Sequence, residues 1–333
     1  MLILALLAVQ AAPQPGALKT FGDWTVACDN TRLCTATSLP IKADDSGTYD
    51  DNSIALTIVR AAGAGGELRI ETDGGGSAVM LQVDGRKVAR GTPGSDGTVF
   101  TGAAVLEAVR ALANGKEARV MAGGGMVGGV SLAGLSATLR YIDAEQGRAG
   151  TVTALVARGT KPASAVPPAR PMPRIASVRP NGQPVRLTGA LNAAMIKLGH
   201  CEDETGPSDL KTEVYALGGG RSLALVPCGA GAYNFASVPF VITAGKPALA
   251  RFDSPPGFTA EENGVPLLVN AAFEPTTGQL SSFSKGRGLG DCGSSEVYVW
   301  DGTRFRMIEA RQMGECRGST NWLRTWVAMP EPR

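Results

Sequence analysis

Residues 288–305 read GLGDCGSSEVYVWDGTRF, a glycine-rich loop followed by alternating apolar residues. The first six residues have the G-x-G-x-x-G spacing of a dinucleotide-binding loop. In such a loop a helix must follow the glycines and direct its free N–H groups at the pyrophosphate. Here Val297 and Val299 alternate with Tyr298 and Trp300, and Asp301-Gly302 is a strong hairpin signal, so a strand follows instead. The stretch therefore predicts an antiparallel hairpin and no nucleotide cofactor.

The loop also contains one of six cysteines, and an even number is typical of paired thiols. Of the fifteen formally possible pairings, joining neighbours in sequence gives Cys28–Cys34, Cys201–Cys228 and Cys292–Cys316. A metal site normally shows C-x-x-C spacing and histidines, whereas this chain has one histidine and no C-x-x-C. Disulfides persist in oxidising compartments outside the cytoplasm. We therefore expect three disulfides, an exported protein and no bound metal.

The N-terminal residues MLILALLAVQA agree with export. Leu2 to Val9 form an apolar core of the length found in signal peptides, and Val9 to Ala11 fit a cleavage site before Ala12. The basic segment that usually precedes such a core is missing. About ten apolar residues are too few to span a bilayer, and no later run is long and uncharged enough. We interpret residues 1–11 as a signal peptide and expect a periplasmic protein without a transmembrane segment.

The composition is that of a globular protein. The chain has 333 residues, 44% hydrophobic and 19% charged, with a net charge of +2. Nucleic-acid-binding proteins normally carry a strongly basic face. The near-neutral balance therefore predicts no nucleic-acid partner.

A proline-rich segment, residues 161–184, divides the chain. It holds seven prolines and little periodicity, which is typical of a semi-rigid linker. We expect an N-terminal domain over 12–160 and a C-terminal domain over 185–333. Each is predicted to have α+β architecture, with a mainly antiparallel sheet and one or two helices.

Alternating apolar residues predict strands, and apolar residues spaced three and four apart predict helices. In the N-terminal half the helices are expected over 102–113 and 131–147, with Ser131 as the N-cap of the second. The expected strands there are 21–28, 53–61, 67–73, 78–89 and 151–159. In the C-terminal half one helix over 188–199 precedes a meander of strands at 222–228, 232–242, 266–273, 279–283, 296–300, 304–310 and 322–328.

A second glycine pattern, Gly123-x-Gly125-x-x-Gly128, precedes the helix expected at 131–147. A dinucleotide site would also need a second strand ending in an acidic residue about twenty positions on, and that strand is missing. We interpret the segment as a flexible loop from strand to helix beside a ligand groove. Gly125 and Gly128 are accordingly candidate ligand-binding residues.

Four further groups of residues have competing interpretations. His200 with Glu202, Asp203 and Glu204 has the chemistry of a metal or acid–base site, but an exposed acidic loop after a helix is favoured. ADDSGTYDDN, residues 43–52, has oxygen side chains spaced by two as in a calcium loop, but its glycine is misplaced and a solvated loop is favoured. Trp322 and Trp326 fit either a core or an exposed ligand platform, and a core is favoured. Asp291, in the first glycine loop, and Trp322 are included as candidate ligand contacts.

The ordered motifs FGDWTVACDNTRLC, SLAGLSATLRYIDAEQGRAGTVTALVARG, LVPCGAGAYN, RGLGDCG, WDG and ECRG resemble one family. This is the group of secreted proteobacterial proteins known as domain of unknown function 1176. The resemblance implies a periplasmic protein with disulfides, and it supplies no activity and no catalytic residues. The N-terminal half also resembles the invasion-associated locus B family, through F-x-D-W-x-V-x-C and the S-L-x-G opening of the helix. That second resemblance implies an envelope or host-interaction role.

The leading functional hypothesis is a disulfide-stabilised periplasmic binding or envelope-associated protein without catalytic activity. Its partner would be an envelope protein or glycan. One alternative is a hydrolase of envelope glycan or peptide that uses carboxylates such as Asp29, Asp291 or Glu296. Another is an inhibitor of a secreted hydrolase, presenting a disulfide-fixed loop.

Overall fold

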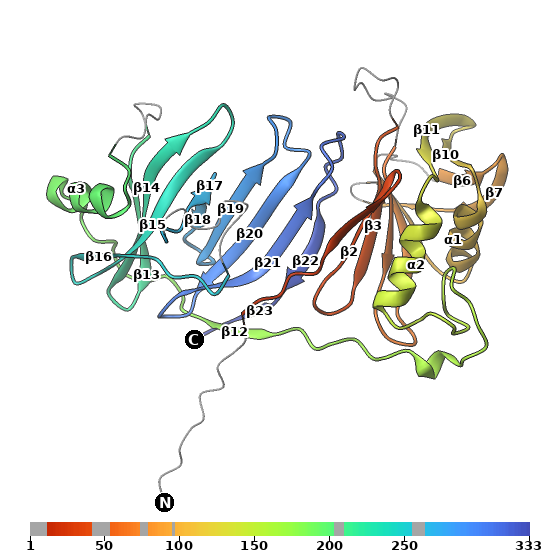
Figure 1. Ribbon diagram of the computed structural model, residues 1–333, viewed down its shortest axis with the longest axis horizontal. Coiled ribbons are helices and arrows are strands. Elements are labelled where there is room, and N and C mark those ends of the chain that lie inside the picture. Colours follow the sequence, from red (N-terminus) through yellow and green to blue (C-terminus); the bar gives the residue numbers. More distant parts are fainter. Residues whose placement is uncertain (1–11, 42–53, 74–78, 95–96, 203–209, 255–263) are drawn as a thin grey trace, which may run out of the picture.

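The protein consists mainly of antiparallel β-sheets with three α-helices, as the computed structural model shows (Figure 1). The structure describes residues 12–41, 54–73, 79–94, 97–202, 210–254 and 264–333. The predicted α+β class is confirmed at this level. The proposed signal peptide (1–11), the calcium-loop candidate (43–52) and the acidic pair Asp203 and Glu204 lie outside the described residues.

The N-terminal half contains a seven-stranded antiparallel sheet with strand order β1-β2-β3-β4-β5-β9-β8. Its strands alternate buried and exposed residues where one face is solvated, as in β5, and are buried throughout where both faces are covered, as in β2. The bounds are β1 Leu18–Phe21, β2 Trp24–Cys28, β3 Cys34–Ser38, β4 Leu56–Arg60, β5 Leu68–Asp73, β8 Thr92–Pro93 and β9 Gly97–Phe100.

A four-stranded antiparallel sheet lies beside it in the order β11-β10-β6-β7. Its strands are β6 Val79–Val83, β7 Arg86–Arg90, β10 Glu117–Ala122 and β11 Gly125–Ser131. Asp84 and Gly85, at φ 47° and 77°, form the predicted hairpin turn between β6 and β7.

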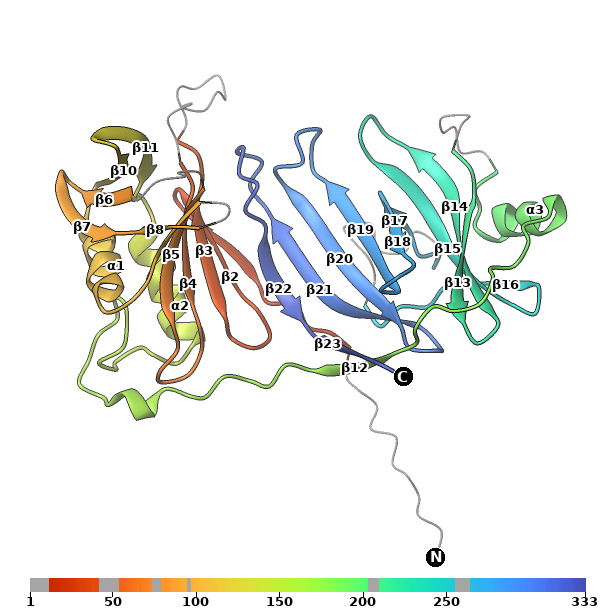
Figure 2. The same ribbon diagram turned by 180° about the vertical axis from the view of Figure 1, so that it is seen from behind.

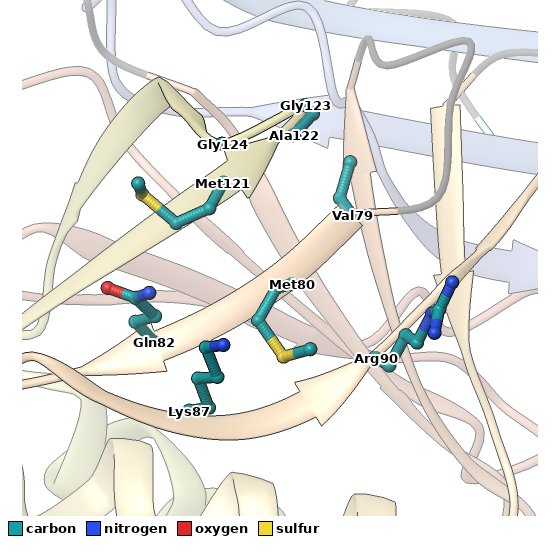
Figure 3. A pocket seen from close by; sticks show the side chains of 9 residues that line it. All are labelled: Val79, Met80, Gln82, Lys87, Arg90, Met121, Ala122, Gly123 and Gly124. Atoms are coloured by element: carbon teal, nitrogen blue, oxygen red, sulfur yellow. The ribbon is translucent and has the colours of Figure 1, made fainter.

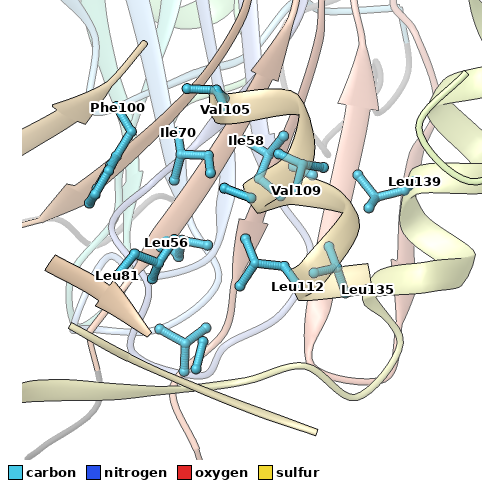
Figure 4. Packing of buried hydrophobic residues seen from close by; sticks show 14 of the residues in the cluster. Leu56, Ile58, Ile70, Leu81, Phe100, Val105, Val109, Leu112, Leu135 and Leu139 are labelled. Atoms are coloured by element: carbon cyan, nitrogen blue, oxygen red, sulfur yellow. The ribbon is translucent and has the colours of Figure 1, made fainter. Parts of the chain in front are cut away.

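Helices α1 (Ala104–Asn114) and α2 (Leu135–Glu145) close the N-terminal core. Val105, Val109 and Leu112 of α1 and Leu135 and Leu139 of α2 are fully buried. They pack on apolar side chains of both sheets, which include Leu56, Ile58, Ile70, Leu81 and Phe100 (Figure 4). The helical spacing of apolar residues therefore identified both helices.

The segment at 123–128 forms a hairpin, and the prediction of a loop from strand to helix is wrong. Gly123 and Gly124, at φ 58° and 87°, make the turn between β10 and β11. Glycine adopts this left-handed conformation without steric cost. Ser131 is not the N-cap of α2, because it is the last residue of β11 and its hydroxyl donates to Asp23 at 2.6 Å. Gly134 occupies the N-cap position instead.

The strand predicted over 151–159 is also absent from the structure, which has only a single bridge at Thr151 in this range. The backbone of this segment forms hydrogen bonds to a side chain in place of a neighbouring strand. The fully buried Asp143 carboxylate accepts hydrogen bonds from the N–H groups of Leu155, Val156 and Ala157 at 2.8 to 2.9 Å. Three bonds to a charged acceptor replace a ladder, so apolar alternation alone was misleading here.

The C-terminal half begins with helix α3 (Gly189–Leu198), as predicted, and Thr188 caps it by accepting from the Leu191 N–H. Two antiparallel sheets of five strands each follow. The first contains β13 Glu213–Gly218, β14 Arg221–Ala230, β15 Phe235–Thr243, β16 Lys246–Leu249 and β17 Leu268–Val269. The second contains β18 Ala272–Glu274, β19 Gln279–Lys285, β20 Gly293–Trp300, β21 Phe305–Met313 and β22 Leu323–Val327.

The hairpin predicted from EVYVWDGTRF is confirmed as β20 and β21. The Asp301 carboxylate fixes its turn by accepting from the N–H groups of Thr303 and Arg304 at 2.7 and 2.9 Å. Tyr298, Trp300 and Phe305 then face the apolar cluster shared by the two C-terminal sheets.

Residues 161–184 pass along one side of the molecule from α2 towards α3 (Figures 1 and 2). They include a short 3-10 helix, η1 (Ala163–Ala165), and strand β12 (Arg174–Ser177). The proline-rich composition did not predict β12, which pairs in parallel with β23 (Met329–Pro332) near the C-terminus. The division into domains at 12–160 and 185–333 stays a prediction.

The two halves contact each other through β22, which lies against β2 and β3. Asp29, which follows β2, has a fully buried carboxylate that pairs with Arg324 at 2.7 Å. Asn30 exchanges two hydrogen bonds with the backbone of Val327 at 2.8 and 2.9 Å. Polar pairing thus fixes how the two halves meet. Among the described residues, none of the helices has the length and apolar character needed to cross a membrane.

Candidate functional site

The loop joining β19 to β20, residues 286–292, presents an apolar side chain to solvent. Leu289 at its tip is 75% exposed, the largest value among the bulky apolar residues that the structure describes. The loop lies at the same end of the molecule as the β14–β15 and β21–β22 connections (Figures 1 and 2). We call residues 286–292 the stapled loop, because several contacts hold it.

The disulfide Cys292–Cys316 is the covalent part of this staple, and it joins the loop to the β21–β22 connection. The other predicted pairs, Cys28–Cys34 and Cys201–Cys228, are present as well. The backbone closes the loop where the Gly286 N–H donates to the Cys292 carbonyl at 2.7 Å. The predicted pairing is therefore confirmed.

One glycine of the G-x-G-x-x-G pattern is required by the staple and not by a phosphate. Gly293 has φ 137°, and a Cβ there would lie 1.9 Å from the Ser284 carbonyl oxygen. Any side chain would force β19 and β20 apart directly beside Cys292. The glycine permits the close approach of strands that positions the disulfide.

Asp291 holds the loop electrostatically. Its carboxylate, almost fully buried, pairs with the guanidinium of Arg287, whose Nε donates to Oδ1 at 2.8 Å, and also accepts from the Gly318 N–H. The Arg287 contact and the Gly318 hydrogen bond hold the pKa of the Asp291 carboxyl below its usual value, against the opposing effect of burial. The Asp291 carboxylate, as an anion, thus joins Arg287 of the loop to Gly318 of the β21–β22 connection.

Aromatic side chains support the loop on two sides. The indole N–H of Trp322 donates to the Gly290 carbonyl at 3.2 Å, and its ring lies 4.9 Å from that of Phe283. On the other side the Tyr233 hydroxyl donates to the Gly286 carbonyl at 3.2 Å. Trp322 also packs against a buried cluster of Leu39, Cys292 and Met313. The exposed Leu289 therefore stands on a supported framework.

This chain is similar to known proteins over most of its length. The family described as protein of unknown function (DUF1176) matches residues 18–329. The chain belongs to the DUF1176 family. The uncharacterised protein YpfG of Escherichia coli (strain K12) is 30% identical to it over 346 residues, covering 96% of this chain and 94% of YpfG. The crystal structure of invasion associated protein B from Bartonella henselae is 21% identical, with a TM-score of 0.30, and covers 39% of this chain and 99% of its own.

In this DUF1176 protein the structure brings two of the four candidate ligand contacts together. Asp291 and Trp322 both hold the stapled loop, Asp291 through Arg287 and the Gly318 N–H and Trp322 through the Gly290 carbonyl. Gly125 and Gly128 lie apart from them in β11, on the four-stranded sheet. Leu289 and Arg287 were not singled out from the sequence, although a leucine between two glycines and an arginine four residues before an aspartate were signals for them.

The remaining candidates of the DUF1176 chain have structural contacts. Asp29 accepts from the Thr31 hydroxyl at 2.6 Å and pairs with Arg324. Glu296 is buried in the middle of β20. His200 follows α3 and has φ 55°. Its backbone N–H donates to the Lys197 carbonyl. Within the described part of the chain, no group of three or more His, Cys, Asp and Glu side chains is arranged to hold a metal ion.

Proposed function

We propose that this protein is a periplasmic, non-catalytic binding protein that contacts a partner protein of the cell envelope through the stapled loop. Leu289 would enter an apolar pocket on the partner. The observation that carries the proposal is a highly exposed leucine on a loop held by a disulfide, an ion pair and two aromatic hydrogen bonds. The three disulfides support residence in an oxidising compartment.

The rigidity of the loop favours a binding role. Ordering a flexible loop on association opposes binding by about 0.5 to 1.5 kcal/mol for each immobilised side chain. A loop that is already held avoids most of this loss. The exposed Leu289 side chain contributes little to the stability of the fold. A preformed surface that contacts a partner, in contrast, requires an apolar side chain in this exposed position.

A hollow near the loop extends the surface available to a partner. It measures about 510 Å³ and is bordered by Leu210, Phe235 and Asn270, among others. Asn270 donates to Asn234, and Asn234 donates to the Lys285 carbonyl at the start of the loop. The hollow and the loop therefore belong to one hydrogen-bonded unit.

The hydrolase alternative finds less support in the candidate carboxylates. Asp29 and Asp291 each face an arginine and several hydrogen-bond donors, so both have an evident structural role. The inhibitor hypothesis is favoured by the same observation as partner binding, because a rigid projecting loop is suited to block an active-site cleft. It differs only in the identity of the partner.

Site-specific photocrosslinking tests the proposal. A photoreactive phenylalanine analogue replaces Leu289, and Leu198 at the end of α3, which is 49% exposed, supplies a matched control position. We expect a defined partner crosslinked from position 289 in intact cells and not from position 198. The same crosslink should weaken when Cys292 and Cys316 are both changed to Ser. Equal labelling from both positions would contradict the proposal.

The purified partner then separates the two kinds of binding. Isothermal titration should show that Leu289→Asp weakens the complex at least tenfold, whereas Leu198→Asp leaves it unchanged. If the partner is a hydrolase, the inhibitor hypothesis predicts that its turnover falls when the wild-type protein is added. If the turnover of the hydrolase stayed unchanged while it formed a tight complex, the protein would bind its partner without inhibiting it, and the inhibitor hypothesis would be wrong.

A further inference from the structure

The outer face of the four-stranded sheet carries a hollow of about 330 Å³ that the stapled loop does not share. It is bordered by residues of β6, β7 and β10 and of the Gly123–Gly124 turn (Figure 3). Small-molecule sites in proteins typically measure about 300 to 1,000 Å³. The hollow therefore has the size of a site for a small ligand.

The strand alternation explains why this face is not covered by the core. Leu81 and Val83 of β6 point inward to the apolar cluster under α1, so Met80 and Gln82 point outward. In the ladder Met80 lies between Met121 of β10 and Arg90 of β7. Two methionines thus form an apolar floor beside a cation.

The rim of the hollow is positively charged. Lys87 and Arg90 are exposed and line it, while its other lining side chains are apolar or neutral. Among the ion pairs of the described residues none involves Lys87 or Arg90. The site thus offers two cations to a ligand that brings negative charge.

We propose that this hollow binds a small amphipathic anion, namely an alkyl carboxylate. The carboxylate contacts Arg90 and Lys87, and the alkyl chain lies over Met80 and Met121. Arginine pairs well with carboxylates because its planar N–H groups match both oxygens. Methionine is flexible and polarisable, so it adapts to an alkyl chain of variable position. This site is independent of the proposed partner-binding loop, because it lies on a different sheet.

A chain-length series tests the apolar part of the proposal. Straight-chain alkyl carboxylates of increasing length are titrated below their micellar concentrations, and alkyl ammonium ions of the same lengths serve as the charge control. Each added methylene should tighten carboxylate binding by up to about fourfold until the hollow is filled. The ammonium series should bind at least tenfold more weakly. Equal affinity for the two series, or no dependence on length, would overturn the proposal.

Single variants test the residues. Arg90→Gln and Lys87→Gln should each weaken carboxylate binding about two- to fivefold, since exposed ion pairs are modest in water. Both effects should shrink as salt is raised. Arg86→Gln is the matched control, because Arg86 is exposed on the same strand but does not line the hollow. Met121→Gln should reduce the dependence on chain length while leaving charge selectivity in place, because Met80 still contacts the chain. Weakening by Arg86→Gln equal to that by Arg90→Gln would show non-specific attraction and overturn the assignment.

Discussion

Single buried carboxylates hold backbone segments that no ladder holds. Asp291 joins the stapled loop to the β21–β22 connection, Asp143 binds three consecutive N–H groups, and Asp29 pairs across the two halves. In each case the carboxylate accepts hydrogen bonds from backbone N–H groups, which for Asp29 are those of Thr31 and Leu33. The sequence shows such residues only as isolated aspartates, because their donors are distant in the chain or lie in irregular segments.

Asp291 should make the stability of the protein depend on pH in the acid range. Because its pKa is lowered in the folded state, its stabilising effect is fully present above the unfolded value of about 3.9 and is lost as pH falls through the lower folded value. Asp291→Asn should lower the free energy of unfolding by about 1 to 2 kcal/mol at pH 7. The loss is modest because Arg287 is partly exposed, so water screens its charge.

Urea unfolding at pH 7, 4 and 3 measures this effect. The difference in the free energy of unfolding between wild type and Asp291→Asn should become smaller as the pH falls. Glu315→Gln, in the connection that the disulfide joins, is the control and should follow the wild-type profile. A difference that stays constant from pH 7 to 3 would show that the Asp291 charge does not contribute.

Elements with a repeating local pattern were predicted well. The β6–β7 and β20–β21 hairpins follow from Asp-Gly turns between alternating residues, and all three helices follow from apolar spacing. The misplaced elements are the strand at 151–159 and the loop at 123–128. In the first, Asp143 replaced the ladder, and in the second the glycines formed a turn within a sheet.

Asp143→Asn should loosen the segment at 150–160 without removing α2. An asparagine oxygen offers one neutral acceptor in place of two charged oxygens that bind three N–H groups. We expect a loss of stability of about 2 to 3 kcal/mol. Hydrogen exchange should show early loss of protection at Leu155, Val156 and Ala157. If their protection were unchanged relative to the amides of α2, the carboxylate would not be what holds this segment.

The arrangement of the whole molecule depends on contacts between residues far apart in the chain. Strand β22 lies against β2, and the buried Asp29–Arg324 pair and the Asn30 hydrogen bonds lie at this contact. Local pattern indicated that β2 and β22 are strands but not that they meet. The predicted boundary between two domains concerns folding independence, which stays a prediction.

A double-mutant cycle on Asp29 and Arg324 should measure the coupling between the halves. Asp29→Asn and Arg324→Gln should each destabilise the protein, and the double variant should lose less than the sum, with a coupling energy of about 1 to 3 kcal/mol. The pair Arg69 and Glu71, partly exposed and within one strand, is the control and should show a coupling energy below about 1 kcal/mol. Strict additivity for Asp29 and Arg324 would mean that the pair does not join the halves.

The sequence by itself determined the α+β class, the helices and the main hairpins, because each depends on residues close together in the chain. Joining cysteines that are neighbours in sequence also predicted the three disulfides. It also excluded the nucleotide interpretation of GLGDCG, since a strand follows the glycines. Only the tertiary structure decided that Asp291, Trp322 and Tyr233 support one exposed leucine, and that Met80, Met121 and Arg90 border one hollow. The first group comes from three connections between strands and the second from three strands. Their proximity is set by sheet register and packing, which leave no local pattern.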